Sequence, residues 1–119
     1  MAEVFISLGS NLGDRCATLA DARRRLQDGG TLRLTACSPI YESEPWGPVA
    51  QPPYLNQVCR GETALGPHEV LGFLQAVERQ AGRDRSREQR WGPRPLDLDL
   101  LAYDDLILDD PVLTLPHPR

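Results

Sequence analysis

Two aspartates two residues apart, Asp97 and Asp99, are the side chains of this sequence best placed to bind a divalent cation. They alternate with Leu96, Leu98 and Leu100, a pattern typical of a strand with one buried face. Side chains two positions apart point to the same face, about 6.5–7 Å apart along the strand, so both carboxylates can reach one cation. An open, solvated sheet face is the alternative interpretation, and for an isolated D-x-D pair it is the commoner one.

Arginine is concentrated directly before these aspartates. Guanidinium groups form paired hydrogen bonds with phosphate oxygens, and a hard cation binds carboxylate and phosphate oxygens together. The two features side by side predict a site for a polyphosphate that carries a divalent cation. The arginines are Arg83, Arg85, Arg87, Arg90 and Arg94.

The composition excludes several other kinds of site. A net charge of −4 argues against binding nucleic acid or a membrane surface through bulk electrostatics. All 13 basic residues are arginine, since the sequence contains no lysine. A P-loop of the G-x-x-x-x-G-K type and Schiff-base chemistry are therefore excluded, and any phosphate must be held by arginine, backbone amides or metal.

The three cysteines, Cys16, Cys37 and Cys59, form neither a zinc pattern nor a small disulfide framework. We expect them to be buried free thiols in a reducing compartment. The sequence shows no basic-then-apolar leader and no apolar run of about 18 residues. These features predict a cytoplasmic protein with no membrane segment.

The periodicity of apolar residues predicts two helices between four strands. The first helix follows a turn at residues 9–14, where Asn11 or Asp14 is the candidate N-cap, and ends before Gly29. The second begins at Pro67 and ends at Gly82. The strands are expected at residues 4–8, 32–41, 54–62 and 96–104.

This order, β-α-β-β-α-β, predicts an α+β protein, an α/β sandwich with a ferredoxin-like antiparallel sheet and both helices on one face. Residues 1–119 form one domain in this interpretation. The second strand is expected to turn Leu32, Leu34 and Ala36 to one side. Because the leucines of the last strand must face the helices, we expect Asp97 and Asp99 on the open face, beneath the long loops.

Residues 42–53 are predicted to form an irregular loop, because they contain four prolines and a glycine. Long loops in compact domains are often functional. Two interpretations of Trp46 stay open: the ring folds back over the core, or it forms one wall of a pocket for a flat ligand.

Four segments of the chain resemble the signatures of the 6-hydroxymethyl-7,8-dihydropterin pyrophosphokinase family. They are Gly9-Ser10-Asn11-Leu12-Gly13-Asp14, Tyr54-Leu55-Asn56, the run from Arg90 to Asp99 (R-W-G-P-R-P-L-D-L-D), and Leu115-Pro116-His117-Pro118-Arg119. The matches occur in order over essentially the whole chain. The resemblance implies a ferredoxin-like α/β sandwich and transfer of pyrophosphate from ATP to a pterin alcohol, releasing AMP, in folate biosynthesis.

The resemblance also implies roles for individual residues. Asp97 and Asp99 match ligands of two magnesium ions, and with Arg83 and Arg94 they form the expected catalytic set. The positions that match contacts to ATP, on its triphosphate or elsewhere on the nucleotide, are Gln75, Glu78, Arg83, Arg85, Arg90, Arg94 and His117, with Trp91 in a loop that closes on the substrates. The positions that match the pterin pocket are Ser43, Glu44, Trp46, Tyr54 and Asn56.

In such a reaction, positioning and charge neutralisation do most of the work. We assign no general base, although Asp97 could accept the hydroxyl proton. The loops at 43–53 and 83–93 are hypothesised to close over ATP. The partners implied are ATP and the dihydropterin alcohol, with no nucleic acid, no membrane and a monomeric chain.

Two other interpretations stay open. One is a non-catalytic ferredoxin-like module that binds nucleotide or RNA through the arginine loop. The other is a metal-dependent phosphotransferase acting on another flat heterocycle. Family members usually continue beyond the L-P-H-P-R motif, so we expect the C-terminal part of the domain to be absent and the chain to be less stable and poorly active on its own.

Overall fold

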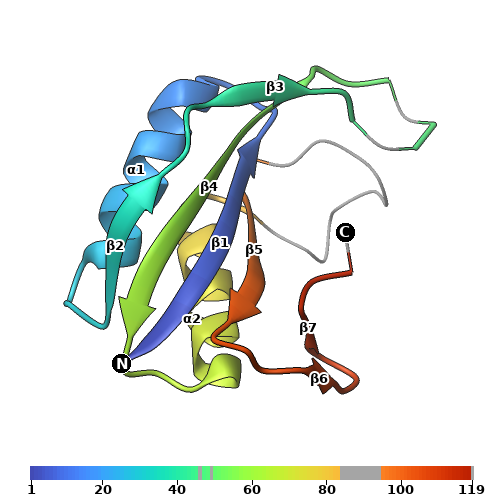
Figure 1. The fold of residues 1–119 in the computed structure, drawn as a ribbon. Helices are drawn as coiled ribbons and strands as arrows, with labels where there is room; N and C mark the ends of the chain where they lie inside the picture. Colours follow the sequence, from blue (N-terminus) through green and yellow to red (C-terminus); the bar gives the residue numbers. More distant parts are fainter. Residues whose placement is uncertain (46, 49, 84–94, 119) are drawn as a thin grey trace.

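The computed structural model describes residues 1–45, 47–48, 50–83 and 95–118, and these form an α+β fold (Figure 1). The chain follows the predicted order of strands and helices, with three short strands in addition. The elements are β1 (Ala2–Ser10), α1 (Arg15–Gln27), β2 (Leu32–Cys37), β3 (Tyr41–Ser43), β4 (Tyr54–Thr63), α2 (Pro67–Gln80), β5 (Asp97–Tyr103), β6 (Leu108–Asp109) and β7 (Thr114–Leu115).

The main sheet is antiparallel throughout, in the order β2-β4-β1-β5, and β3 pairs with the first residues of β4. The strands β6 and β7 form a separate two-stranded sheet that lies beside β5 in Figure 1. The predicted α+β class and the antiparallel sheet are confirmed.

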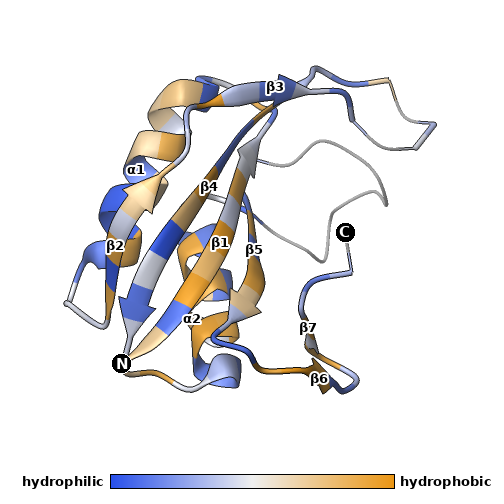
Figure 2. Cartoon of the chain, viewed as in Figure 1, coloured by the Kyte–Doolittle hydropathy of each residue, from blue (hydrophilic) through white to orange (hydrophobic). Residues whose placement is uncertain are grey.

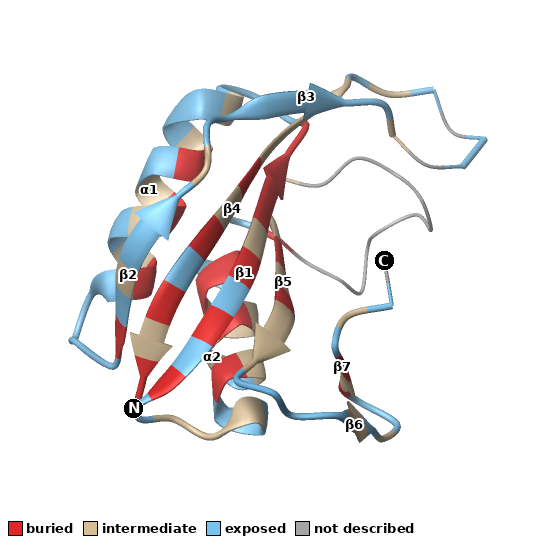
Figure 3. Ribbon diagram, viewed as in Figure 1, coloured by how far each residue is buried: buried red, intermediate tan, exposed pale blue. Residues whose placement is uncertain are grey.

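One face of the sheet carries the core. Val4, Ile6 and Leu8 are completely buried, while Glu3 and Phe5, which alternate with them, are exposed. Figure 3 shows this alternation along β1, and Figure 2 shows the apolar character of β1 and β5. Both helices join the same buried cluster, because their inward residues pack on the buried side chains of the sheet. Those helical residues are Leu19, Ala22, Leu26, Val70, Leu74 and Val77.

The ends of both helices are fixed by the residues that the sequence suggests. Asp14 is the N-cap of α1, and its carboxylate accepts a hydrogen bond from the Ala17 backbone at 3.1 Å. Pro67 opens α2, and the side chain of Glu69 accepts from the Gly66 backbone at 2.9 Å. Caps of this kind contribute about 1 kcal/mol each to helix stability.

The second strand is shorter than predicted, and its later residues face the other way. The register with β4 shifts between Leu34 and Ala36, so Ala36 pairs with Arg60 and Cys37 pairs with Cys59. Thr35 is the extra residue of this bulge, and an extra residue reverses the faces of the residues that follow. Ala36 therefore does not share the face of Leu34, and strand pairing with β4 resumes at β3.

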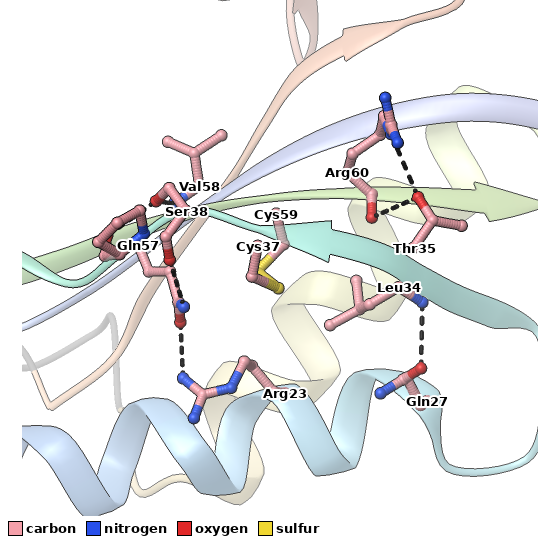
Figure 4. Close-up of a disulfide and its surroundings, with 11 residues drawn as sticks. Arg23, Gln27, Leu34, Thr35, Cys37, Ser38, Gln57, Val58, Cys59 and Arg60 are labelled. Carbon is pink, nitrogen blue, oxygen red and sulfur yellow. Dashed lines mark hydrogen bonds between the residues drawn. A yellow bond between two sulfur atoms is a disulfide. The ribbon is translucent and has the colours of Figure 1, made fainter.

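The predicted state of the cysteines is wrong. A disulfide joins Cys37 to Cys59 across β2 and β4 (Figure 4). Cys16 is a free cysteine on the exposed surface of α1. Only Cys59 is buried, since Cys37 is exposed at the edge of the sheet. In the part of the chain that the structure describes, no helix is both long and apolar enough to cross a membrane.

Candidate functional site

The register of four strands places two predicted site residues, Asp97 and Asn56, in one row on the face of the sheet opposite the helices. Asp97 pairs with Gly9, Gly9 pairs with Asn56, and Asn56 pairs with Tyr41. Residues that are direct partners in a ladder point to the same face, and neighbouring strands lie about 4.8 Å apart. The carboxylate strand and Asn56 are therefore two strand spacings apart, roughly 10 Å, with Gly9 between them.

Gly9 keeps the middle of this row free of a side chain. A Cβ at this position would touch Asn56 Oδ1 and Tyr54 Cδ1, each at 3.4 Å. The two side chains of β4 thus lean over the backbone of β1. In the sequence Gly9 reads as part of a turn, and its place in the row becomes visible only with the strand register.

The two aspartates of β5 share a face, as their spacing predicts. Both are half-buried, while Leu98 and Leu100 beside them are 3% and 2% exposed on the core side. Each carboxylate has a cationic or ionisable neighbour from another part of the chain. Asp97 Oδ1 lies 3.0 Å from Arg83 Nη1, and Asp99 Oδ1 lies 3.6 Å from His117 Nε2.

Arg83 and Glu78 form a buried ion pair at the free edge of β5. Arg83 Nη1 donates to Glu78 Oε2 at 2.7 Å and to the carbonyl oxygen of Leu96 at 3.2 Å. Glu78 Oε2 also accepts from the backbone of Leu98 at 2.8 Å. Buried charges require such partners, so the pair covers the exposed edge of the strand and holds the Asp97 carboxylate from one side.

The sequence could have pointed to this pair. Glu78 lies one helical turn after Leu74, on the inward face of α2, and it is 1% exposed. An acidic residue on the buried stripe of an amphipathic helix needs a cation nearby. Arg83, the first arginine after the helix, is that cation.

His117 reaches Asp99 because its backbone pairs with β5. The backbone nitrogen of His117 donates to the carbonyl oxygen of Leu101 at 2.8 Å. Burial raises the pKa of the Asp99 carboxyl above its ordinary value, and the neighbouring Asp97 carboxylate raises it further. His117 and Arg83 act in the opposite direction. A bound cation would act in the same direction as His117 and Arg83, because it favours the charged form of the carboxyl.

The far end of the row carries the residues that the family resemblance assigns to the pterin. Asn56 Nδ2 donates to Ser43 Oγ at 2.7 Å, and Ser43 is the ladder partner of Tyr54. The structure therefore brings Ser43, Tyr54 and Asn56 together. Glu44 follows directly after β3 and is exposed.

The chain before Tyr54 is held by residues that neither the spacing nor the family resemblance assigns to the site. Asn11, which is 1% exposed, donates to Gln51 Oε1 at 2.7 Å and to the carbonyl oxygen of Pro52 at 3.1 Å. Arg15 donates to the carbonyl oxygen of Pro53 at 2.8 Å. The turn after β1 thus fixes the point at which the proline-rich loop enters β4.

Several predicted site residues lie outside the described residues. Gln75, which the structure does describe, is half-buried on α2. The predicted closure of the loops at 43–53 and 83–93 also falls partly outside the described ranges. The predicted site residues outside these ranges are Trp46, Arg85, Arg90, Trp91 and Arg94.

The two carboxylates on the described face could bind a cation that takes most of its ligands from substrate and water. Within the described ranges no three His, Cys, Asp or Glu residues come close enough together to hold a metal. Magnesium is commonly bound by one or two carboxylates, with substrate phosphates and water completing its shell. Asp97 and Asp99 fit that pattern, and they do not fit a closed structural metal site.

Comparison with known proteins places the chain in a family. Residues 5–119 match the family model described as 7,8-dihydro-6-hydroxymethylpterin-pyrophosphokinase. The 2-amino-4-hydroxy-6-hydroxymethyldihydropteridine pyrophosphokinase of Pseudomonas aeruginosa is 44% identical over 117 residues, covering 96% of this chain and 69% of the relative. The protein of the same name from Aquifex aeolicus is 38% identical, covering 99% of the chain and 71% of the relative.

A longer relative matches over the same residues. The mitochondrial folate synthesis bifunctional protein of Arabidopsis thaliana is 44% identical over 98% of this chain, which spans only 21% of that protein. The chain thus corresponds to about a fifth of the plant relatives and to roughly seven tenths of the bacterial ones. The chain belongs to the 7,8-dihydro-6-hydroxymethylpterin-pyrophosphokinase family.

Proposed function

We propose that the chain transfers pyrophosphate from ATP to the hydroxymethyl group of 6-hydroxymethyl-7,8-dihydropterin, with magnesium and with release of AMP, in folate biosynthesis. The observation that carries this proposal is the row on the open face of the sheet. It sets a polar and aromatic group, Tyr54 and Asn56, about two strand spacings from a carboxylate pair, Asp97 and Asp99. Family membership supplies the reaction class.

The proposed fold type is ferredoxin-like. In such a fold the β-α-β-β-α-β order gives an antiparallel sheet with both helices on one face. The order β2-β4-β1-β5 and the single helical layer support this assignment. The short strand β3 is an addition that lengthens the outer edge of the sheet next to the proposed pterin residues.

The proposed heterocycle site uses Tyr54 for stacking and Asn56 for hydrogen bonding. A carboxamide offers both donors and acceptors, which complement the amide and amino groups on the edge of a pterin. Because Ser43 Oγ accepts one hydrogen bond from the Asn56 amide, it fixes how the amide is turned. Glu44 and Trp46 belong to the same proposed site.

The proposed phosphate site lies at β5. Asp97 and Asp99 would hold two magnesium ions, which supply neutralisation of phosphate charge when bound. His117 is placed beside Asp99 and would contact the triphosphate. Arg83 is buried against Asp97, so in this arrangement it positions the carboxylate. Gln75, Arg85, Arg90, Trp91 and Arg94 remain predicted nucleotide contacts.

The proposed reaction is an in-line displacement. The hydroxymethyl oxygen of the pterin attacks the β-phosphorus of ATP, the bond from that phosphorus to the oxygen shared with the α-phosphate breaks, and AMP leaves with that oxygen. The protein contributes position, since stacking and hydrogen bonding at Tyr54 and Asn56 direct the hydroxymethyl group toward β5. The predicted nucleotide-contact arginines, Arg85, Arg90 and Arg94, would stabilise charge on the transferred group.

Release of AMP from ATP in the presence of the pterin alcohol and magnesium tests this function. Asp97→Ala should lower kcat/KM by at least about 100-fold, because a missing carboxylate costs several kcal/mol of transition-state stabilisation. Asp105→Ala is the matched control, since Asp105 is exposed in the turn after β5. Equal AMP release by the two variants would remove Asp97 from the reaction.

The remaining expectations stay predictions. They are a monomeric state, no binding to nucleic acid or membrane, and a cytoplasmic location. The expected lack of nucleic-acid and membrane binding follows from the acidic net charge, and the other two are expectations from the sequence pattern and the family resemblance.

A further inference from the structure

The disulfide between Cys37 and Cys59 encloses the proposed pterin site. The two residues are direct ladder partners, with Cα atoms 4.1 Å apart and a sequence separation of 22. The covalent ring that they close contains β3, the proline-rich loop and the first residues of β4. Every residue assigned to the pterin lies inside it: Ser43, Glu44, Trp46, Tyr54 and Asn56.

The segment that enters this ring from Cys37 is exposed, and it is held to β4 by hydrogen bonds and not by buried side chains. Residues 39–44 are all exposed, and so are residues 35–37. The bulge at Thr35 interrupts the ladder directly before the disulfide. Segments with few buried contacts and exposed hydrogen bonds open locally at low cost. A covalent link at Cys37 should therefore reduce how often this segment opens.

The polar contacts next to the disulfide connect it to the site. Ser38 donates its backbone N–H to the Val58 carbonyl oxygen at 2.8 Å, and its Oγ accepts from the Val58 N–H at 3.0 Å. Its carbonyl oxygen accepts from Gln57 Nε2 at 2.8 Å, and Gln57 accepts in turn from Arg23 of α1 at 2.6 Å (Figure 4). Ser38 then leads into β3, which brings Ser43 to Asn56.

The two cysteines of the disulfide differ in solvent exposure, and this difference allows the bond to be reduced and reformed. Cys37 is exposed, whereas Cys59 is completely buried in the core cluster. A small thiol can therefore approach the bond from the Cys37 side, and exposed disulfides are the labile ones. Cys16, the third cysteine, lies on the surface of α1 and is free.

We propose that Cys37 and Cys59 are a site of reversible oxidation whose state sets the order of residues 38–44 and thereby the affinity for the pterin. The effect on affinity rests on the proposed function. The bonded form holds Ser43 against Asn56. In the dithiol form this edge opens more often, and the pterin must bind a state that is populated for only part of the time.

The oxidant is a low-molecular-weight disulfide, for which glutathione disulfide is the probe. The Cys37 thiolate attacks one of its sulfurs, the glutathione S–S bond breaks, and a glutathione thiolate leaves. The Cys59 thiolate then attacks the Cys37 sulfur of the mixed disulfide and releases the second glutathione thiolate. Two electrons pass from the cysteines to glutathione disulfide, and the two thiol protons end on the released glutathiones.

A redox titration tests the site in the Cys16→Ser variant, in which Cys37 and Cys59 are the only cysteines that can be alkylated. The protein is equilibrated over a series of glutathione to glutathione disulfide ratios, quenched, alkylated and weighed by mass spectrometry. Hydrogen exchange of residues 38–44 is measured without ligand at both ends of the series. We expect both thiols to appear together as the series becomes more reducing. Hydrogen exchange of residues 38–44 should be faster at the reduced end than at the oxidised end.

Pterin binding is then measured in each state with a non-hydrolysable ATP analogue present. If the ordered edge is populated one fifth of the time in the dithiol form, the apparent Kd for the pterin rises about fivefold. The Kd for the ATP analogue alone should be equal in the two states. Cys37→Ser should behave as the dithiol form at every ratio. If that variant does not fold, the redox titration of the Cys16→Ser protein decides the question by itself.

Each other outcome is decisive. A pair that stays bonded, or stays free, over the whole series overturns reversible oxidation. Thiols that titrate with no change in exchange or in pterin Kd overturn the coupling to the site. If the thiols titrate and exchange responds, but neither state binds the pterin, the redox-dependent order is supported and the proposed function fails.

Discussion

The guanidinium of Arg83 lies 3.0 Å from the Asp97 carboxylate, with the arginine side chain only 1% exposed. The same nitrogen is 2.7 Å from Glu78 Oε2, and Glu78 also accepts from the Leu98 backbone. A helix, the residues directly after it and the edge strand of the sheet are thus joined at one point. The position of Asp97 depends on a charge balance inside the protein as well as on the strand that carries it.

Removing Glu78 should destabilise the whole fold. Glu78→Ala leaves the buried Arg83 with less compensation and the Leu98 N–H without this acceptor, at a cost of about 3 kcal/mol. Glu78→Gln retains an acceptor and should cost less. Urea unfolding measures both variants. Glu62→Ala is the matched control, because its ion pair with Arg33 is exposed and worth less than about 1 kcal/mol. Equal losses at Glu78 and Glu62 would contradict the buried pair.

The space above Gly9 should matter for the pterin and little for stability. In Gly9→Ala the new methyl would touch both Asn56 and Tyr54, so the KM for the pterin should rise about tenfold, a typical effect of one methyl group in a fitted pocket. The KM for ATP should stay unchanged. Steady-state kinetics with each substrate varied in turn measure this difference.

Gly72→Ala is the matched control for Gly9→Ala, because it makes the same substitution at a glycine outside the row. Nothing lies within 4 Å of a Cβ at that position in α2, and alanine is favoured over glycine in a helix by about 1 kcal/mol. This variant should therefore gain stability and keep both KM values. A pterin KM that rises equally in both variants would exclude a specific role for the row.

The hydrogen bond from Asn56 to Ser43 predicts a separate effect on binding. Ser43→Ala removes the acceptor at 2.7 Å, so the Asn56 amide is free to turn, at a cost of about 1 kcal/mol or a fivefold rise in pterin Kd. Isothermal titration calorimetry measures it. An unchanged Kd in Ser43→Ala would show that the amide needs no such support.

The sequence predicted the parts of this structure that depend on local patterns. Asp97 and Asp99 share a face because a strand has a period of two, and Asp14 and Pro67 begin helices through contacts within one turn. The bulge at Thr35 was missed, because an extra residue in a strand is defined only against a distant partner, here Arg60. The pairing of Cys37 with Cys59 follows from that bulge, so it was missed as well.

The contact of Glu78 with the backbone of β5 was missed for a related reason. The resemblance assigned both Glu78 and Arg83 to the nucleotide, and the spacing of α2 alone does not say which strand its inward face meets. Only the packing of α2 on the edge of β5 brings the carboxylate to the Leu98 backbone. Side chains that join two elements far apart in sequence are thus the part that periodicity does not predict.

The contact between α2 and the loop after β6 predicts how stability responds to acid. His68 Nε2 lies 2.7 Å from Asp110 Oδ2, and Asp110 also accepts from the backbones of Val112 and Leu113. The hydrogen bond with His68, followed by the one from Val112, lowers the pKa of Asp110 below its ordinary value of 3.8. The folded protein therefore releases this proton at a lower pH than the unfolded chain does.

A lowered carboxyl pKa stabilises the folded state above the ordinary value, and this stabilisation is lost as the pH falls through the lowered one. Asp110→Asn should therefore be less stable than the parent chain near pH 7, and its stability should fall less steeply below about pH 4. Urea midpoints measured across that range test this, with Asp105→Asn, an exposed aspartate of the preceding turn, as the control. If the acid dependence of Asp110→Asn overlays that of the parent chain, the His68–Asp110 contact does not form in solution.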